Sequence, residues 1–240
     1  MKFSDKIALV TGGTGALGSV VVRNFLDEGA SVAVTYMSDA DGEKFRSTIQ
    51  KKFPRAVAFK TNVTKAEEVE HLCKVMIERF GTIDIACNLV GGYMPKTDIV
   101  DLTEKEWDFM FDLNLKSCFL CTREVLKIMK QKKYGRVINV SAMAGLIPQA
   151  GRGAYGISKA AVSTLTMIAG EETKALRGAD ITVNAVAPSV ILTLPNVSTA
   201  SQEETINWVT PEQIAQTILF LASDSGAPVT GQTIKIYGKL

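Results

Sequence analysis

Short apolar runs alternate with longer amphipathic stretches along the whole chain. The short runs stop at glycine, proline or polar residues, which is typical of strands buried on both faces of a sheet. Predicted strands cover residues 7–10, 31–36, 56–59, 83–88, 136–141, 181–187 and 233–236. The longer stretches have the period of helices that pack on a sheet, and they cover residues 20–28, 41–53, 65–80, 104–132, 153–176 and 211–222.

Residues at the helix ends support several of these boundaries. Thr103 and Glu106 form a capping box before the long helix, and Thr64 can cap the helix that begins at Lys65. Gly81 follows that helix, at a position where glycine is favoured. Strands and helices alternate over all 240 residues with no linker and no repeat. The sequence therefore predicts a single doubly wound α/β domain with a parallel sheet.

Composition excludes some classes of function. Hydrophobic residues make up 46% of the chain and charged residues 22%, and the net charge is +2, all ordinary for a globular protein. No stripe of clustered Lys and Arg indicates nucleic acid, and no apolar run approaches the ~20 residues that span a bilayer. The first residues show no signal-peptide cleavage pattern, so we expect a cytoplasmic protein.

Four cysteines are present, and Cys118 and Cys121 form a C-x-x-C motif inside an apolar helical pattern. The single histidine, His71, lies on another segment, and no second ligand pair is near the motif. Buried free thiols in a reducing compartment are therefore favoured over a metal site or a redox pair.

A glycine-rich turn, from Thr11 to Gly18, joins the first predicted strand to the first predicted helix. Glycines allow backbone to approach a pyrophosphate, and the helix N-terminus that follows favours its negative charge. The position of this turn at the start of the chain predicts a dinucleotide site.

A hydroxyl, a phenol and an amine lie in the stretch from Ser141 to Lys159. Tyr155 and Lys159 are four residues apart and would share one helix face, where the ammonium favours the phenolate and lowers the phenol pKa. Ser141 ends a predicted strand, at the edge where open α/β sheets bind ligands. A Tyr and a Lys at this spacing also occur on ordinary helix faces, so the pair needs support from other motifs.

That support comes from Asn114 in the long helix and from Asn184-Ala-Val-Ala-Pro188 leading to Thr193. With these motifs, the chain resembles the short-chain dehydrogenase/reductase family over essentially its whole length. The resemblance implies one NAD(P)-binding Rossmann domain over residues 1–240, with a seven-stranded parallel sheet and a short substrate lid at about 192–207. It implies hydride transfer between nicotinamide and a carbonyl or alcohol substrate.

The resemblance also implies roles for four residues. Tyr155 would be the general acid in carbonyl reduction, and Lys159 would lower its pKa and bind the nicotinamide ribose. Ser141 would hydrogen-bond the substrate oxygen, and Asn114 would hold a water in a proton relay to Lys159. The residues implied to bind the cofactor are Gly12, Gly15, Leu17, Gly18, Tyr36, Asn62, Val63, Asn88, Gly91, Tyr155, Lys159, Pro188, Ile191 and Thr193.

Part of the sequence has a narrower resemblance, and it bears on the choice of substrate. A narrower resemblance, carried by Gly13–Ser19, Val90–Tyr93 and the segment from Pro188 to Trp208, is to quinonoid dihydropteridine reductases, which lack the catalytic serine. Because Ser141 is present, we rank a ketone such as a 3-oxoacyl thioester above a pterin. A nucleotide-binding regulator without turnover is a third interpretation, which the complete catalytic set disfavours.

The cofactor and the assembly are further expectations. Tyr36 stands where an Asp or Glu would select NAD(H), and Ser38 can donate to a 2′-phosphate. Met37 occupies the place of an expected basic residue, and Asp39 would repel a phosphate, so we predict only a mild preference for NADP(H). The apolar outer faces of the helices at 104–132 and 153–176 predict a homo-oligomer, a tetramer as in the family.

Overall fold

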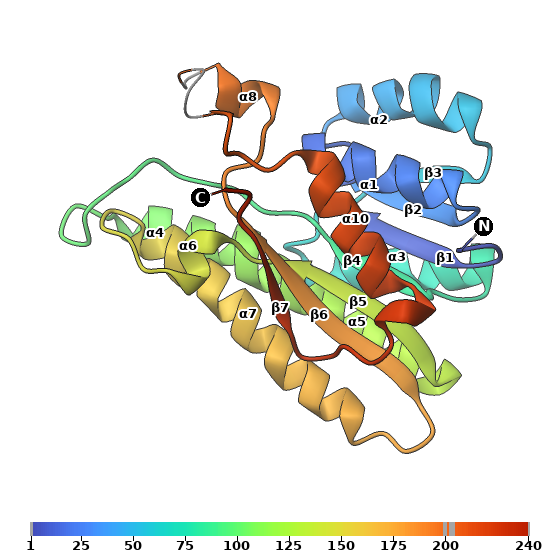
Figure 1. Ribbon diagram of the computed structural model, residues 1–240. Helices are drawn as coiled ribbons and strands as arrows, with labels where there is room; N and C mark the ends of the chain where they lie inside the picture. Colours follow the sequence, from blue (N-terminus) through green and yellow to red (C-terminus); the bar gives the residue numbers. More distant parts are fainter. Residues whose placement is uncertain (1, 199–200, 202–204, 240) are drawn as a thin grey trace.

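One seven-stranded sheet, in the order β3-β2-β1-β4-β5-β6-β7, forms the centre of the computed structural model, which describes residues 2–198, 201 and 205–239 (Figure 1). Every neighbouring pair of strands is parallel. The strands are β1 (Ile7–Thr11), β2 (Ser31–Tyr36), β3 (Ala56–Lys60), β4 (Ile85–Asn88), β5 (Tyr134–Val140), β6 (Asp180–Pro188) and β7 (Thr233–Ile236). The predicted doubly wound Rossmann topology is confirmed.

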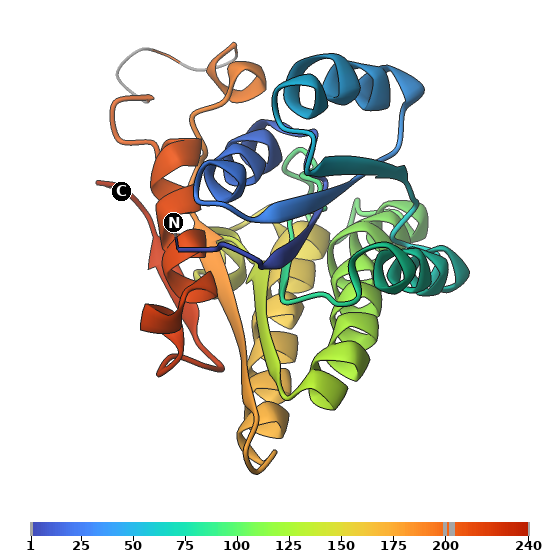
Figure 2. The same ribbon diagram turned by 90° about the vertical axis from the view of Figure 1, so that its right-hand side faces the viewer.

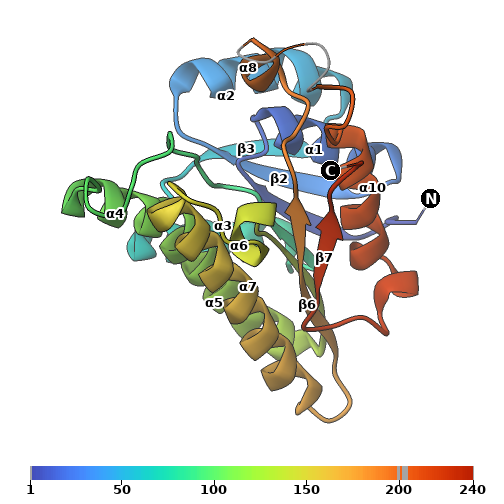
Figure 3. The same ribbon diagram turned by 60° about the vertical axis from the view of Figure 1, so that its left-hand side comes forward.

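Helices cover both faces of this sheet (Figures 1 and 2). They are α1 (Ala16–Asp27), α2 (Asp39–Phe45), α3 (Ala66–Phe80), α4 (Glu104–Met110), α5 (Ser117–Lys132), α6 (Met143–Leu146), α7 (Gly153–Lys174), α8 (Leu194–Val197) and α10 (Pro211–Ala222). Phe25 of α1 and Ile218 of α10 belong to the core on one face, and Met76 of α3 and Val125 of α5 belong to the core on the other. Figure 3 shows α5 and α7 side by side.

Two predicted helices contain π-helical turns. The predicted helix 41–53 consists of α2 and the π-helix η1 (Arg46–Gln50), and the predicted helix 104–132 contains the π-helix η2 (Phe111–Lys116) between α4 and α5. The first helix begins at residue 16 instead of 20, so it starts directly after the glycine turn. Single π-turns inside helices often occur at functional sites, and η2 contains Asn114.

The capping predictions have different outcomes. The capping box of Thr103 and Glu106 is present, and Gly81 ends α3 with a φ of 77°. The predicted cap by Thr64 is wrong, because α3 begins one residue later and Lys65 occupies the cap position. The Thr64 hydroxyl instead donates to Asn62 Oδ1 at 2.8 Å.

The carboxyl ends of the strands lie at one edge of the sheet, where the chain turns back from β3 to β4 beside β1. Of the predicted lid at 192–207, the structure describes α8 and residues 201 and 205–207, whereas 199–200 and 202–204 lie outside the described residues. No helix among the described residues is long and apolar enough to cross a bilayer. All four cysteines are buried free thiols, as predicted, and the described residues contain no metal-binding cluster of acidic, His and Cys side chains.

Candidate active site

The glycine turn between β1 and α1 is built for close backbone contact. Gly12 has a φ of +66°, and its amide donates to Thr35 Oγ1 at 3.1 Å. Gly15 caps α1, and a Cβ at Gly18 would collide with the Gly12 carbonyl. The turn is therefore restricted to glycine at Gly12 and Gly18, and the N-terminus of α1 lies at the cleft that Leu17 lines.

The end of β2 brings a basic residue to Tyr36 that the sequence reasoning missed. Arg46 Nη1 donates to the Tyr36 hydroxyl at 3.4 Å, and its guanidinium lies 5.9 Å from the ring centroid. Asp39, predicted to repel a phosphate, forms an ion pair with Lys60 at 2.8 Å. The expected absence of a basic group beside Tyr36 is therefore wrong, because η1 brings a residue ten positions away back to the strand end.

The segment after β3 is an Asn-centred turn. Asn62 Oδ1 accepts from the Thr64 backbone amide at 3.0 Å, and the Asn62 backbone amide donates to Glu68 Oε2 at 2.6 Å. Val63 is buried and belongs to a small apolar cluster that Val90 contacts. Both predicted cofactor residues thus lie at the carboxyl edge of the sheet, beside the end of β2.

Asn88 is the last residue of β4 and Gly91 lies in the loop after it, and the two differ in how they face the cleft. The Asn88 side chain is buried and donates to Asn139 Oδ1 at 2.8 Å and Thr122 Oγ1 at 3.1 Å, so it faces the core. Gly91 lines the cleft, and a Cβ there would lie 2.8 Å from Lys159 Nζ. Asn88 can therefore contribute to a ligand site through its backbone, whereas Gly91 leaves room beside the lysine.

Asn114 holds the loop after β4 in place. Its Oδ1 accepts from the Gly92 amide at 2.8 Å, and its amide nitrogen donates to the Gly92 carbonyl at 3.2 Å and to Ser158 Oγ at 3.0 Å. Asn114 is 1% exposed. The side chain thus ties η2 to this loop and to α7, next to Lys159. The predicted water relay stays a prediction.

Tyr155 and Lys159 lie on the first turns of α7 and line one cavity of about 480 Å³. Lys159 is buried, and its ammonium donates to the Val140 carbonyl at 2.9 Å. Burial lowers the pKa of Lys159 to about 8. Burial also raises the pKa of Tyr155, while the positive charge of Arg152 opposes this rise. The predicted lowering of the phenol pKa by Lys159 is not found, because the ammonium faces the end of β5.

Ser141 has partners that the sequence did not suggest. Its hydroxyl donates to the Lys159 carbonyl and accepts from Ser163 Oγ, both at 2.8 Å. It is 1% exposed, and both Ser141 and Ala142 line the cavity. The Ser141 hydroxyl donates to α7 in this structure, so the predicted bond to a substrate oxygen would require the hydroxyl to exchange the Lys159 carbonyl for the substrate.

The end of β6 and the segment after it contribute part of the cavity lining. Pro188 and Ile191 line it, and Ile191 pairs with Val209 in an isolated bridge. The Thr193 amide donates to the Ile191 carbonyl at 2.9 Å, and Asn196 donates to the same carbonyl at 2.8 Å. The predicted residues at 188–193 thus lie together at the cavity, with Thr193 at the start of α8.

Tyr93 and Arg152 are cavity residues that the sequence reasoning did not assign. The Tyr93 ring lies edge-on to Tyr155 with centroids 5.4 Å apart, and the Arg152 guanidinium lies 4.5 Å from the Tyr93 centroid. Arg152 occurs three residues before Tyr155, immediately before α7, and this position in the sequence was the available signal.

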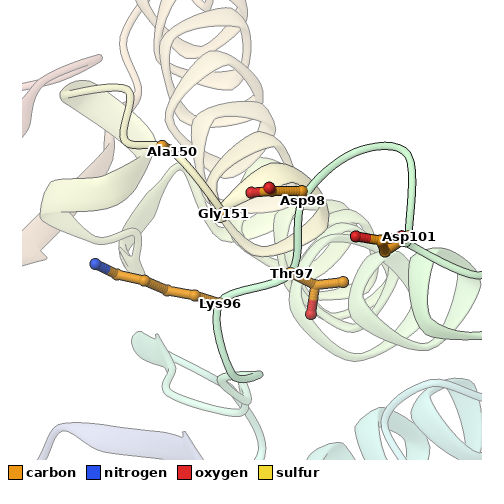
Figure 4. Close-up of a pocket in the computed structure, with 6 residues that line it drawn as sticks. All are labelled: Lys96, Thr97, Asp98, Asp101, Ala150 and Gly151. Carbon is orange, nitrogen blue, oxygen red and sulfur yellow. The ribbon is translucent and has the colours of Figure 1, made fainter.

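A second depression lies between residues 96–101 and 150–151, outside the cavity of Tyr155 (Figure 4). Figure 4 shows Lys96 directed away from the carboxylates of Asp98 and Asp101. The Thr97 amide donates to the Gly151 carbonyl at 2.9 Å, so this contact joins the two loops. The depression shows no acid–base set comparable to that of the main cavity.

Comparisons with known proteins agree with this geometry. The family model described as Enoyl-(Acyl carrier protein) reductase matches residues 13–238. The 3-oxoacyl-[acyl-carrier-protein] reductase FabG of Staphylococcus epidermidis is 34% identical over 244 residues, covering 98% of each chain. The subunit BbsD of the (2S)-[(R)-hydroxy(phenyl)methyl]succinyl-CoA dehydrogenase of Thauera aromatica is 34% identical over 250 residues, covering 99% of this chain and 97% of that protein.

Among solved structures, levodione reductase superposes with a TM-score of 0.90 at 26% identity, covering 98% of this chain and 97% of the other. Sequence and fold therefore match oxidoreductases that act on ketones or alcohols, over nearly the full length of the chain. The chain belongs to the short-chain dehydrogenase/reductase family.

Proposed function

We propose that this protein reduces a ketone with a nicotinamide cofactor and that Tyr155 donates the proton. The observation that carries the proposal is the placement of Tyr155 on α7, inside a cavity at the carboxyl edge of the sheet and one turn before the buried Lys159. An ordinary phenol titrates at about 10 and burial raises the pKa of Tyr155 further, so the side chain is protonated at neutral pH and has a proton to donate.

The residues present fit a dinucleotide. The restricted glycines of the turn and the N-terminus of α1 provide a place for a pyrophosphate, and the space beside Gly91 adjoins Lys159. Residues 188–193 would hold the carboxamide end, and Asn62 and Val63 the adenine end. When bound, a reduced nicotinamide supplies the hydride. Lys159 would bind the ribose, and Asn114 fixes the loop that borders it.

The favoured substrate is a 3-oxoacyl thioester, because the relative in Staphylococcus epidermidis is a 3-oxoacyl-[acyl-carrier-protein] reductase. The test is NADPH oxidation with an acetoacetyl thioester. Tyr155→Phe should lower kcat by at least about a hundredfold, since a positioned acid contributes about that much or more. The dissociation constant of NADPH should change little. If the variant kept most of its kcat, another group would have to be the acid.

Arg46 strengthens the preference for NADP(H) beyond the sequence-based expectation. Its guanidinium, which also pairs with Glu43 at 3.3 Å, meets the Tyr36 hydroxyl at the strand end, so a 2′-phosphate would find one cation and one hydroxyl there. The Ser38 hydroxyl caps α2 and donates to Asp41. Arg46→Ala should weaken NADPH binding by about tenfold, the loss of roughly one charge-assisted hydrogen bond, and leave NADH binding unchanged. Cofactor fluorescence titration measures both constants.

Lys44→Ala is the matched control, because Lys44 lies on α2 two residues before Arg46 and forms no ion pair among the described residues. It should leave both constants unchanged. Equal weakening of NADPH and NADH by Arg46→Ala would show that Arg46 does not bind the 2′-phosphate.

A quinonoid dihydropterin is the second candidate substrate, and the partners of Ser141 favour it. The ranking of a ketone above a pterin depended on a serine aimed at the substrate oxygen, but that hydroxyl is bound to α7. The discriminating measurement is kcat/KM with NADH or NADPH for a quinonoid dihydropterin and for an acetoacetyl thioester. A higher kcat/KM for the quinonoid dihydropterin would make the pterin, and not the ketone, the favoured substrate.

A further inference from the structure

The cavity of Tyr155 has an uneven distribution of charge. Of the described residues that line it, Arg152 and Lys159 are the only charged side chains, and no carboxylate is among them. Lys159 is directed to the Val140 carbonyl at the inner wall, whereas Arg152 is half-buried beside Tyr93. An uncompensated guanidinium in a cavity attracts an anion.

The position of Arg152 is fixed by its surroundings and not by an acidic partner. Its backbone pairs with Thr97 in an isolated bridge, and its guanidinium stacks over Tyr93. Nη1 makes one long hydrogen bond, 3.4 Å, to the Met94 carbonyl. None of the ion pairs among the described residues includes Arg152. Most of its donors therefore remain for a ligand.

Arg152 is also close to the reaction. It is the residue before α7, three positions before Tyr155, and both side chains flank the Tyr93 ring. Its charge acts on the Tyr155 phenol. An anion on the guanidinium would therefore lie only a few bonds from an oxygen that receives the Tyr155 proton. The N-terminus of α7, which has no acidic residue in its first turn, adds positive potential on the same side.

We propose that Arg152 binds a carboxylate of the substrate, so that the ketone reduced at Tyr155 belongs to a 3-oxo acid. This inference rests on the ketone reduction proposed above, and it replaces the 3-oxoacyl thioester favoured there by a 3-oxo acid with a free carboxylate. A planar guanidinium binds a carboxylate through two parallel hydrogen bonds, which fixes orientation as well as charge. Arg152 would thereby orient the ketone toward Tyr155, and a neutral ester or thioester would lose this contact.

Acetoacetate and methyl acetoacetate test the proposal, because they differ only in whether the carboxylate is esterified. In the wild type, acetoacetate should have the higher kcat/KM. Arg152→Gln should raise KM for acetoacetate by at least about tenfold, the value of one charge-assisted interaction, and leave KM for the ester almost unchanged. Arg152→Lys should restore part of the loss, since it keeps the charge but not the planar pair of donors.

Lys96→Gln is the matched control, because Lys96 lies on the loop that pairs with residues 151–152, lines the second depression (Figure 4) and is not among the residues that line the cavity of Tyr155. It removes one positive charge at the same ionic strength and should change neither KM. An equal effect of Arg152→Gln on acetoacetate and on its ester would overturn the proposal, as would a wild type that prefers the ester.

A binding measurement separates this inference from the proposed reaction. Trp208 lines the cavity, so its fluorescence in a Trp107→Phe background reports occupancy without turnover. Butanoate should bind more tightly than butanamide, and Arg152→Gln should abolish the difference. If no ketone were reduced but butanoate kept this Arg152-dependent preference, the reaction would be wrong and the carboxylate site right. If ketones were reduced and the preference for butanoate were absent, the proposed reaction would be right and the carboxylate site wrong.

Discussion

At the scale of single residues, Lys159 combines a buried charge with a position one helical turn after Tyr155, the proposed acid. Its ammonium has one protein partner, the Val140 carbonyl, and borders the space at Gly91. A buried ammonium with one hydrogen bond is less stable than the same charge in water, and the pKa of Lys159 falls from 10.5 to about 8 as a result. The folded protein therefore maintains this charge at a cost, which a bound cofactor ribose would reduce.

The cost has a definite pH dependence. Between about pH 8 and 10.5 the unfolded chain keeps the Lys159 proton while the folded chain releases it, so the unfolded state binds more protons. The contribution of this group to the free energy of unfolding therefore rises with pH in that window. We expect wild type to gain stability relative to Lys159→Met between pH 7.5 and 10, as measured by urea unfolding.

The buried cysteines add an opposing trend. Burial raises the pKa of Cys73 and Cys118 to about 12, which makes stability fall as pH rises above 9, and the charge of Lys159 lowers the pKa of Cys118 in turn. The two proteins are therefore compared in a Cys118→Ala background, in which Cys73 contributes to both. Parallel pH profiles for the two proteins would mean that Lys159 keeps its ordinary pKa in the folded state.

The sequence located the residues of the candidate site better than it predicted their contacts. Tyr155 and Lys159 could be recognised because their spacing on a helix is fixed by the helical repeat. Ser141 could be recognised as a strand-end hydroxyl, but its hydrogen-bond partners come from α7, eighteen residues or more away in sequence. Arg46 was missed for a related reason, because only the return of η1 places it at Tyr36.

At the scale of elements, the junction between β5 and α7 determines the shape of the site. Ser141 links the two elements through the Lys159 carbonyl and Ser163, and Lys159 links them again through the Val140 carbonyl. These contacts hold the first turns of α7, with Tyr155, against the end of the strand. In this arrangement the Ser141 hydroxyl acts as a structural link.

Ser141→Ala tests that role. It removes a buried hydroxyl with two partners, so we expect a loss of about 1–3 kcal/mol in the free energy of unfolding and a small change in kcat. Ser163→Ala is the matched control, since it removes the other hydroxyl of the same pair and should give a similar profile. A kcat that fell a hundredfold in Ser141→Ala alone, with stability retained, would assign the substrate oxygen to Ser141.

Element boundaries were predicted well where local signals set them. The strand at Thr233–Ile236 and the helix at Pro211–Ala222 have the predicted bounds, and both begin or end at clear sequence signals. The π-turns were not predictable, because residues 104–132 read as one continuous helical pattern. The wider π-helical turn of η2 has tertiary contacts that this pattern does not show, chiefly those of Asn114 with Gly92 and Ser158.

At the scale of the whole molecule, apolar side chains remain exposed on the helices of one face. Phe109 on α4, Phe119 on α5, and Ile157, Met167 and Ile168 on α7 are each more than two-fifths exposed. The helices α4, α5 and α7 are packed together, so these residues belong to one side of the molecule (Figure 3). Such exposed apolar groups are typical of a protein–protein interface.

We therefore expect a homo-oligomer built on this side, a tetramer with four times the 25.9 kDa mass of one chain. A charge buried in an apolar interface without a partner is strongly unfavourable, so the double change Phe119→Glu and Ile168→Glu should dissociate it. Light scattering at micromolar concentration measures the mass.

Ile77→Glu is the control, because Ile77 lies on α3, is 36% exposed and is outside α4, α5 and α7. This variant should keep the wild-type mass. A wild type of one-chain mass would refute the assembly. A tetramer that survived the double change would require another face. The residues proposed to bind cofactor and substrate all belong to one chain, so dissociation by itself should leave NADPH binding measurable.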